Sequence, residues 1–285
     1  LIKDGTVLER LLEIDTVVFD KTGTLTLEQP AVDRLHPYNG FTEETLLTYA
    51  AAAEHRQTHP VARAILAAAE QHDIPLYNIE DTFCEVGYGV KGVFDGKIIS
   101  IGSIRFMEME EIAVPDTVRC VQENAAKHGH SVVMVAADKL MVGAIELRPT
   151  VREEVADVTA RLRQRGITTY IVSGDHEYPT RALAEQLHID HYIAEMLPGQ
   201  KSEIVAGLRE EGKKVCFIGD GINDAPALKE ADVSVSLRGA TSAAVDTAQV
   251  ILMDGSLSNI IDLFYASQDF AAAQKKNLII TTVPA

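Results

Sequence analysis

The chain has 285 residues, of which 46% are hydrophobic and 24% charged, an ordinary globular composition for one large domain or two smaller ones. Its 42 acidic and 26 basic residues give a formal net charge of −16, which argues against nucleic acid or an anionic membrane surface as the main partner. Cys84, Cys120 and Cys216 form no C-x-x-C pair, which suits a reducing compartment and excludes a cysteine zinc site. No segment reaches the about 20 apolar residues that a membrane span requires.

The first half of the chain mixes helical and strand patterns. Thr16 to Phe19 is short, apolar and β-branched, which predicts a buried parallel strand. The pattern then breaks at Pro30 and Pro37. After it we expect helices over 46–53, 61–71 and 115–127, and strands within 83–101, 131–136 and 140–147.

From residue 150 onward helical and strand patterns alternate. Strands are predicted at 168–172, 191–193, 214–218, 233–237 and 249–253, with helices over 151–162 and 180–187 and another opening near 198–201. Such alternation indicates a parallel sheet with helices on both faces. We therefore expect an α/β fold, a doubly wound parallel sheet formed by 1–28 and 145–285. An α+β insert with an antiparallel sheet, over 29–144, interrupts it after the first strand.

Polar side chains follow three of the predicted parallel strands. They are Asp20 with Thr22, Ser173, and Asp220 with Asp224, and Lys201 opens a helix. Carboxyl ends of neighbouring strands meet at one crevice, where ligands bind in open α/β sheets. A carboxylate there is a nucleophile that needs no general base, because it is ionised at neutral pH. Asp20, Asp220 and Asp224 are also suitable Mg²⁺ ligands, and Lys201 and Ser173 suit phosphoryl oxygens.

Each of these features has an ordinary structural explanation. A lone Asp at a strand end is most often a turn or cap residue, and a lone Gly-Asp-Gly is most often a turn. Three such strand ends and one helix start, in a compatible order in one α/β chain, favour a functional site.

These motifs resemble those of the P-type ATPases, cation pumps with a haloacid-dehalogenase-like catalytic domain. Asp-Lys-Thr-Gly-Thr-Leu-Thr at 20–26 is similar to their phosphorylation motif, and the run from 219 to 228 is similar to their hinge motif. The resemblance implies an aspartyl-phosphate on Asp20, with Thr22 and Asp220 in the Mg²⁺ shell and Asp224 supporting it. Ser173 and Lys201 would hold the phosphate.

The insert resembles the nucleotide-binding domain of the heavy-metal-transporting branch. The residues that carry this resemblance are Glu54, His59, Gly87, Gly89 and Gly92, with Gly102 added as a further pocket residue. It implies that Glu54 and His59 meet the adenine of ATP and that the glycines let the backbone approach the nucleotide. A dinucleotide-binding interpretation fails, because these glycines lie between strands instead of between a strand and a helix.

Two positions depart from the family pattern. Pro149 stands where many relatives carry Asp, and Gln57-Thr58 stands where Ser-Glu is common. We expect these differences to affect subfamily and domain geometry, and to leave phosphoryl transfer intact.

The resemblance also implies what surrounds the chain. Both ends look cut, so we expect a monomeric soluble fragment of an integral membrane protein, on the cytoplasmic side, whose transmembrane and actuator domains lie outside it. The transported ion is not readable from this stretch. Two alternatives remain. A stand-alone phosphatase of the same superfamily typically carries a second Asp where Thr22 stands, and a non-enzymatic module would only sense ATP.

Overall fold

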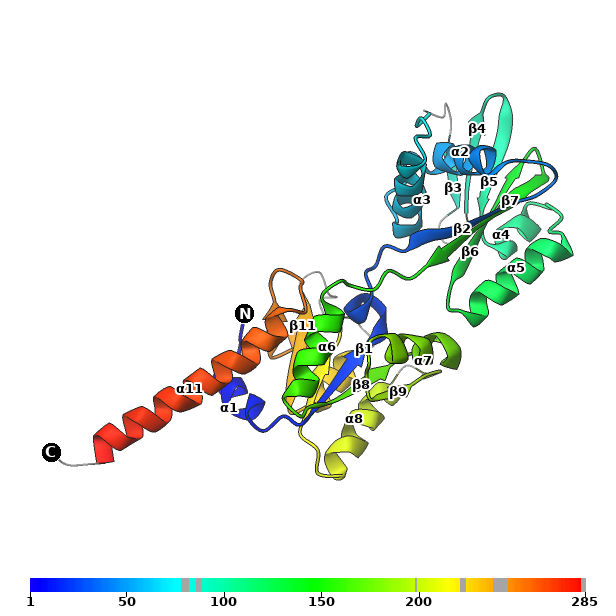
Figure 1. The fold of residues 1–285 in the computed structure, drawn as a ribbon. Coiled ribbons are helices and arrows are strands. Elements are labelled where there is room, and N and C mark those ends of the chain that lie inside the picture. The colour runs from blue at the N-terminus through cyan, green and yellow to red at the C-terminus, as the bar shows by residue number, and fades with distance from the viewer. Residues whose placement is uncertain (78–81, 86–88, 198, 221–223, 238–245, 283–285) are drawn as a thin grey trace. The chain divides into compact units, whose positions relative to one another are not determined.

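The computed structural model describes residues 1–77, 82–85, 89–197, 199–220, 224–237 and 246–282. It divides into two compact units, which Figure 1 shows. The doubly wound unit comprises Leu1–Leu27 and Val151–Ala285, and the insert unit comprises Glu28–Thr150.

The doubly wound unit is built on a parallel six-stranded sheet of order β12-β11-β10-β1-β8-β9. Its strands are β1 (Thr16–Asp20), β8 (Thr168–Val172), β9 (His191–Ile193), β10 (Val215–Ile218), β11 (Val233–Leu237) and β12 (Val250–Leu252). Its helices are α1 (Val7–Leu11), α6 (Val155–Gln164), α7 (Glu177–Gln186), α8 (Gln200–Glu210), α9 (Ala225–Glu230) and α11 (Asn259–Thr282). All five residues of β1 are buried, as its unbroken apolar run predicts for a central parallel strand.

Alternate residues of β1 pack into two separate cores. Val17 and Phe19 join the core formed with α1, α6, α7 and α11, whereas Val18 joins the core formed with α8 and α9. Helices therefore cover both faces of the sheet, and the predicted doubly wound fold is confirmed.

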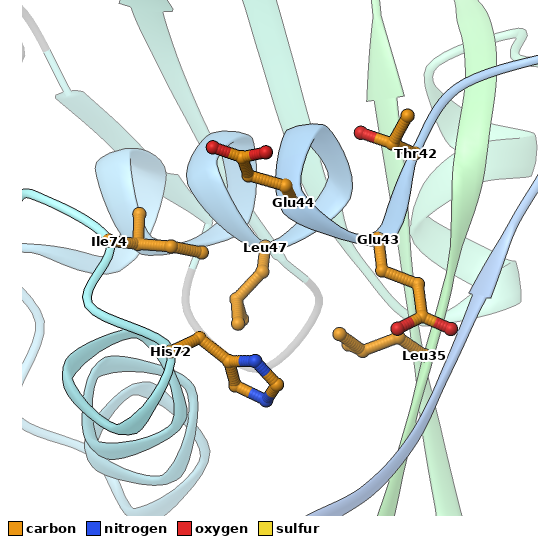
Figure 2. A pocket seen from close by; sticks show the side chains of 7 residues that line it. All are labelled: Leu35, Thr42, Glu43, Glu44, Leu47, His72 and Ile74. Atoms are coloured by element: carbon orange, nitrogen blue, oxygen red, sulfur yellow. The ribbon is translucent and has the colours of Figure 1, made fainter.

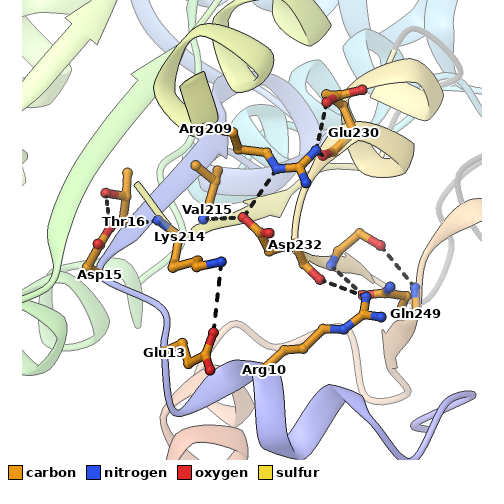
Figure 3. A network of polar contacts seen from close by, with 11 residues as sticks. Arg10, Glu13, Asp15, Thr16, Arg209, Lys214, Val215, Glu230, Asp232 and Gln249 are labelled. Carbon is orange, nitrogen blue, oxygen red and sulfur yellow. Dashed lines mark hydrogen bonds and ion pairs between the residues drawn. The ribbon is translucent and has the colours of Figure 1, made fainter. Parts of the chain in front are cut away.

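A polar network closes the amino ends of the strands, away from the side where ligands bind in such sheets (Figure 3). Arg209 pairs with Glu230 at 2.7 Å and with Asp232 at 3.4 Å. A carboxylate oxygen of Asp232 also accepts the backbone N–H of Val215 at 3.0 Å. These contacts tie α8, α9 and the start of β10 together.

The insert unit is built on an antiparallel sheet of order β2-β7-β6-β5-β4-β3. Its strands are β2 (Ala31–Pro37), β3 (Thr82–Glu85), β4 (Gly89–Phe94), β5 (Lys97–Gly102), β6 (Ser131–Ala137) and β7 (Leu140–Arg148). Its helices are α2 (Glu43–Glu54), α3 (Pro60–Gln71), α4 (Ile104–Met109) and α5 (Asp116–Lys127). Helices α2 and α3 share a core with one face of the sheet, and α4 and α5 share a core with the other.

The structure adds strand β2 and helices α4, α9 and α11 to the predicted elements. The sequence of strand β2 does not alternate with period two, because Asp33 is the extra residue of a β-bulge between Val32 and Arg34. The bulge lets Val32 and Leu35, three positions apart, both pack on the α2–α3 core.

The domain boundary after residue 144 is corrected by the structure. β7 continues to Arg148, which pairs with Ala31 of β2, so the insert unit runs to Thr150. A boundary at 144–145 would cut this strand in two. Among the described residues, no helix combines the length and apolarity needed to cross a membrane.

Candidate active site

The predicted strand-end residues lie at adjacent strands of the parallel sheet. β1 pairs with β10 on one side and with β8 on the other. Asp20 ends β1, Ser173 follows β8, and Asp220 follows β10. This order arises because β1, the first strand, is inserted between two later ones, which is the topological switch point of the sheet.

Lys201 joins two buried carboxylates. It lies in the first turn of α8, and its Nζ donates to Oδ1 of Asp20 at 2.7 Å and to Oδ1 of Asp224 at 2.6 Å. The exposed fractions of the Asp20 and Asp224 side chains are 7% and 1%, so both contacts are shielded from water. Charge-assisted hydrogen bonds of this kind are the strong ones in proteins.

A third carboxylate, Asp220, completes an acidic cluster with these two. One oxygen from each of Asp20, Asp220 and Asp224 lies within 4.8 Å of the others. Burial, together with the charges of Asp224 and Asp220, raises the pKa of Asp20 to about 7 against the opposing effect of Lys201. Burial opposes the charged form of Lys201, yet Asp20 and Asp224 raise its pKa. Three carboxylates around one ammonium leave local negative charge that a divalent cation would balance.

Two glycines leave the space that these carboxylates occupy. Gly23 has φ +77, and a Cβ built on it would overlap the carboxylate of Asp220. A Cβ on Gly219 would lie 2.7 Å from Oδ2 of Asp224. Sequence reasoning included both glycines in motifs but gave them no role. The approach of Gly23 to Asp220 depends on two strands remote in the chain, and that of Gly219 to Asp224 on the path of the segment after β10.

Three other residues of the site were assigned no role from the sequence. Lys21, with 4% of its surface exposed, forms an ion pair with Asp175, which follows β8. Arg152 donates to the carbonyl oxygens of Gly23 at 2.9 Å and Gly255 at 3.0 Å, so it anchors the loop after Asp20.

The third, Thr24, is fully buried, and its hydroxyl has no hydrogen-bond partner among the residues that the structure describes. A buried polar atom without a partner costs about 1–3 kcal/mol, so this hydroxyl is a candidate contact for a bound group. The predicted Thr22 is exposed, and its backbone is extended, with a ψ of 125°. Ser173 is buried, and its Oγ accepts the backbone N–H of Asp175 at 3.1 Å.

The structure brings Glu54 and His59 together in the insert unit. Glu54 ends α2 with 3% of its surface exposed, and His59 is the N-cap of α3. Nδ1 of His59 accepts the backbone N–H of Ala62 at 3.2 Å, so in the neutral ring the proton sits on Nε2. That atom lies 3.1 Å from Oε2 of Glu54, so the ring N–H faces the buried carboxylate. Burial raises the pKa of Glu54 to about 7 and lowers that of His59.

The predicted glycines of the insert lie on the strands against which α2 packs. Gly89 and Gly92 are in β4, and Gly102, at the end of β5, pairs with Gly89. A Cβ on Gly89 would lie 2.6 Å from the carbonyl oxygen of Ile101 and would overlap the ring of Phe106, so internal packing alone requires this glycine. Gly87 lies outside the described residues.

Figure 2 shows a separate hollow in the insert unit, of about 480 Å³. Leu35, Leu47 and His72 line it, and the carboxylates of Glu43 and Glu44 lie at its rim. Carboxylates at a rim disfavour the phosphates of a nucleotide, so we assign no ligand to this hollow.

The family model of haloacid dehalogenase-like hydrolases matches residues 14–232. The chain belongs to this family. The match spans the insert as well as the strands that carry Asp20, Ser173 and Asp220, so it covers the whole site just described.

Comparison with curated proteins identifies heavy-metal ATPases as relatives. The zinc-transporting ATPase of Bacillus subtilis is 34% identical over 99% of this chain and 44% of its own length. The copper-exporting P-type ATPase of Vibrio cholerae is also 34% identical, over 98% of this chain and 30% of its own length. The chain thus spans less than half of the relatives it matches, and the resemblance inferred from the motifs is confirmed.

Comparison with solved structures also identifies P-type ATPases as relatives. The crystal structure of a zinc-transporting PIB-type ATPase matches with a TM-score of 0.85 and 31% identity, over 98% of this chain and 45% of that one. The catalytic domain of the CPx-ATPase CopB-B, in a study of conformational changes upon nucleotide binding, matches with a TM-score of 0.70 and 29% identity. That match covers 93% of this chain and 94% of the other. The chain therefore has the size and fold of a P-type ATPase catalytic domain.

Proposed function

We propose that this chain transfers the γ-phosphoryl group of ATP to Asp20, forming an aspartyl-phosphate that drives heavy-metal export by a longer protein. The observation that carries the proposal is the buried constellation of Asp20, Lys201 and Asp224 at the switch point of the sheet. A carboxylate held by a cation at such a crevice is positioned to attack an anionic phosphoryl group.

The acidic cluster fits Mg²⁺. Its carboxylate oxygens lie within 4.8 Å of one another, and Mg²⁺ prefers oxygen ligands with one or two carboxylates completed by phosphate and water. Asp20 and Asp220 would hold the ion, with Asp224 beside them and a carbonyl oxygen contributed by Thr22. Bound there, Mg²⁺ supplies charge neutralisation for the phosphoryl oxygens.

The chain's own groups account for the rest of the step. A carboxylate oxygen of Asp20 attacks the γ-phosphorus, a new P–O bond forms, and the bond to the β-phosphate oxygen breaks so that ADP leaves. Lys201 carries the positive charge that the transferred group meets, and the hydroxyls of Ser173 and Thr24 are further donors to its oxygens. Since Thr22 stands in place of a second Asp, no carboxylate at that position activates water, which favours a persistent phosphoenzyme.

We assign ATP binding to the insert unit. The buried Glu54 and its neighbour His59 present a carboxyl group and a ring N–H, suited to the polar edge of adenine. Gly89, Gly92 and Gly102 lie on strands under α2, and Gly87 is proposed with them.

The proposed setting follows from the relatives. Those named above are copper- or zinc-transporting proteins of more than twice the aligned length. We propose that this chain works at the cytoplasmic side of a membrane with transmembrane and actuator domains of the same polypeptide, and that it is monomeric by itself.

Phosphorylation tests the assignment directly. Incubation with Mg²⁺ and γ-labelled ATP should give an acid-stable, hydroxylamine-labile phosphoprotein, which Asp20→Asn abolishes and the exposed control Asp157→Asn on α6 retains. Equal labelling of Asp20→Asn would show that Asp20 is not the nucleophile. Fast turnover of simple phosphate esters without preference for ATP would favour the stand-alone phosphatase.

A binding titration tests the nucleotide assignment separately. His59→Ala should weaken ATP at least about tenfold and leave inorganic phosphate binding unchanged. ATP binding without any labelled protein would instead favour the ATP-sensing module. An unchanged ATP affinity in His59→Ala would remove His59 from the site.

A further inference from the structure

A second cluster of ligand-type side chains lies in the insert unit. One ligand atom from each of Asp33, His130 and Glu146 lies within 4.8 Å of the other two. Nδ1 of His130 is 2.7 Å from Oε1 of Glu146 and 4.0 Å from Oδ2 of Asp33. None of these residues belongs to the proposed phosphorylation or nucleotide sites.

Glu146 is the buried centre of this cluster. It lies in β7 between Ile145 and Leu147, which pack on the α2–α3 core, so its own side chain emerges on the opposite face. Only 7% of its surface is exposed. Its second oxygen, Oε2, lies 2.9 Å from Nε2 of His36, so both carboxylate oxygens are oriented by imidazole rings. A metal-binding carboxylate held in this way by a second partner is typical of protein metal sites.

Asp33 reaches the cluster through the irregularity of β2. It is the extra residue of the β-bulge, and bulges redirect a side chain that regular pairing would point elsewhere. A hydrogen-bonded His–Glu–His network needs no further acid. The bulge nevertheless adds a second carboxylate, whose Oδ1 lies 3.3 Å from Nε of Arg148 and whose Oδ2 lies 3.7 Å from Nε of the exposed Arg34. The side chains of His130 and Asp33 are 22% and 26% exposed, so an ion can reach the cluster from solvent.

We propose that Asp33, His130 and Glu146 form a binding site for a borderline divalent transition-metal ion such as Zn²⁺, with His36 as a positioning residue. Imidazole nitrogen and carboxylate oxygen bind Zn²⁺ at about 2.0–2.2 Å, which places tetrahedral ligand atoms about 3.3 Å apart. The separations of 2.7 and 4.0 Å between ligand atoms of His130 and the two carboxylates lie on either side of that value. A site with no thiolate does not select Cu(I), and its imidazole disfavours Mg²⁺.

The ion would connect the two strands through which the chain enters and leaves the insert unit. β2 is the first strand of this unit and β7 the last, and they pair with each other up to Ala31 and Arg148 (Figure 1). Three protein ligands leave one position for water, so the site suits an exchangeable ion. Binding would raise the thermal midpoint of the insert unit, since a ligand that binds only the folded state stabilises it.

The site is tested on the full chain, with Mg²⁺ in excess throughout to keep the acidic cluster of Asp20 from competing. Zn²⁺ is titrated by calorimetry, and Co²⁺ by the visible absorption of its d–d bands. We expect one Zn²⁺ per chain and a cobalt spectrum of low coordination number. Asp33→Asn and His130→Gln should each weaken Zn²⁺ at least about tenfold.

His36→Gln should weaken Zn²⁺ less than these ligand substitutions, because His36 acts on the cluster through Oε2 of Glu146. His191→Gln, an exposed histidine of the doubly wound unit, is the matched control and should bind as the parent does. Glu146→Gln should abolish binding; if it does not fold, the more exposed Asp33→Asn decides. An affinity that is the same in the parent, Asp33→Asn and His130→Gln, or Zn²⁺ taken up at scattered sites only, would overturn the proposal. The outcome is independent of whether Asp20 is phosphorylated.

Discussion

Gly23 lacks a side chain at the place where the carboxylate of Asp220 lies. A Cβ built on Gly23 would be 2.7 Å from Cγ and 2.8 Å from Oδ1 of Asp220, closer than real Cβ contacts. The two residues come from loops after β1 and β10, which pair as parallel neighbours. We expect Gly23→Ala to displace Asp220, and to lower Mg²⁺-dependent phosphorylation by about two orders of magnitude, comparable to the loss of one electrostatic stabiliser.

The backbone strain of that substitution can be separated from the clash. Gly166 in the same unit has φ +75, and nothing lies within 4 Å of the position that a Cβ on it would take. Gly166→Ala should therefore cost only the strain of positive φ, about 1–2 kcal/mol, and keep phosphorylation near the parent level. Equal phosphorylation defects in the two variants would mean that strain, and not the position of Asp220, limits the reaction.

Lys201 is expected to be essential for stability as well as for transfer. Lys201→Met removes the ammonium that pairs with the buried carboxylates of Asp20 and Asp224, and breaking a buried pair costs about 3–5 kcal/mol. Chemical unfolding at neutral pH without Mg²⁺ measures this loss. The double variant Lys201→Met with Asp224→Asn should recover part of it, because one of the two carboxylates is then neutral. No recovery would show that Lys201 acts mainly through packing.

Glu54 should make the insert unit less stable as the pH rises. Its pKa is about 7 in the folded protein and 4.5 ordinarily, so between these values the folded state holds a proton that the unfolded state has lost. The contribution of Glu54 to stability is therefore greatest below pH 4.5 and falls until the pH passes about 7, by about 3 kcal/mol in total. Glu54→Gln should lack this loss and be the more stable protein at pH 8.

Hydrogen exchange of the α2 amides, compared between variants at each pH, measures the effect of Glu54. Glu70→Gln, an exposed position on α3, serves as the control and should follow the parent. A difference between Glu54→Gln and the parent that stays constant from pH 5 to pH 8 would contradict the assignment of the effect to ionisation.

Arg152 should be irreplaceable by lysine. Its guanidinium donates to carbonyls of Gly23 and Gly255 at the same time, and the single ammonium of lysine lacks this planar fork. We expect Arg152→Lys to lose about 2 kcal/mol of unfolding free energy, the range for a hydrogen bond to a charged group, and to slow phosphorylation by loosening the loop after Asp20. Arg161→Lys, in an exposed pair with Asp157, should change stability by less than about 1 kcal/mol.

The main architecture was predictable from local sequence patterns. The apolar run before Asp20 and the alternation after residue 150 predicted the doubly wound sheet, because buried parallel strands and amphipathic helices leave local patterns. Strand β2 was missed, since the bulge at Asp33 breaks its alternation. The end of the insert was placed inside the predicted strand 140–147, whereas β7 pairs with β2 up to Arg148 and the unit runs to Thr150. The local motifs also named Asp20, Lys201, Asp220 and Asp224.

How those residues combine depends on the order and register of strands that are distant in the sequence. The ammonium of Lys201 meets Asp20 across 181 positions of sequence, Gly23 makes room for Asp220, and Glu146 gathers two histidines from separate strands and loops. No local pattern encodes such contacts, because they depend on strand order and register. In this chain the order places β1 between β8 and β10, and that placement assembles the candidate site.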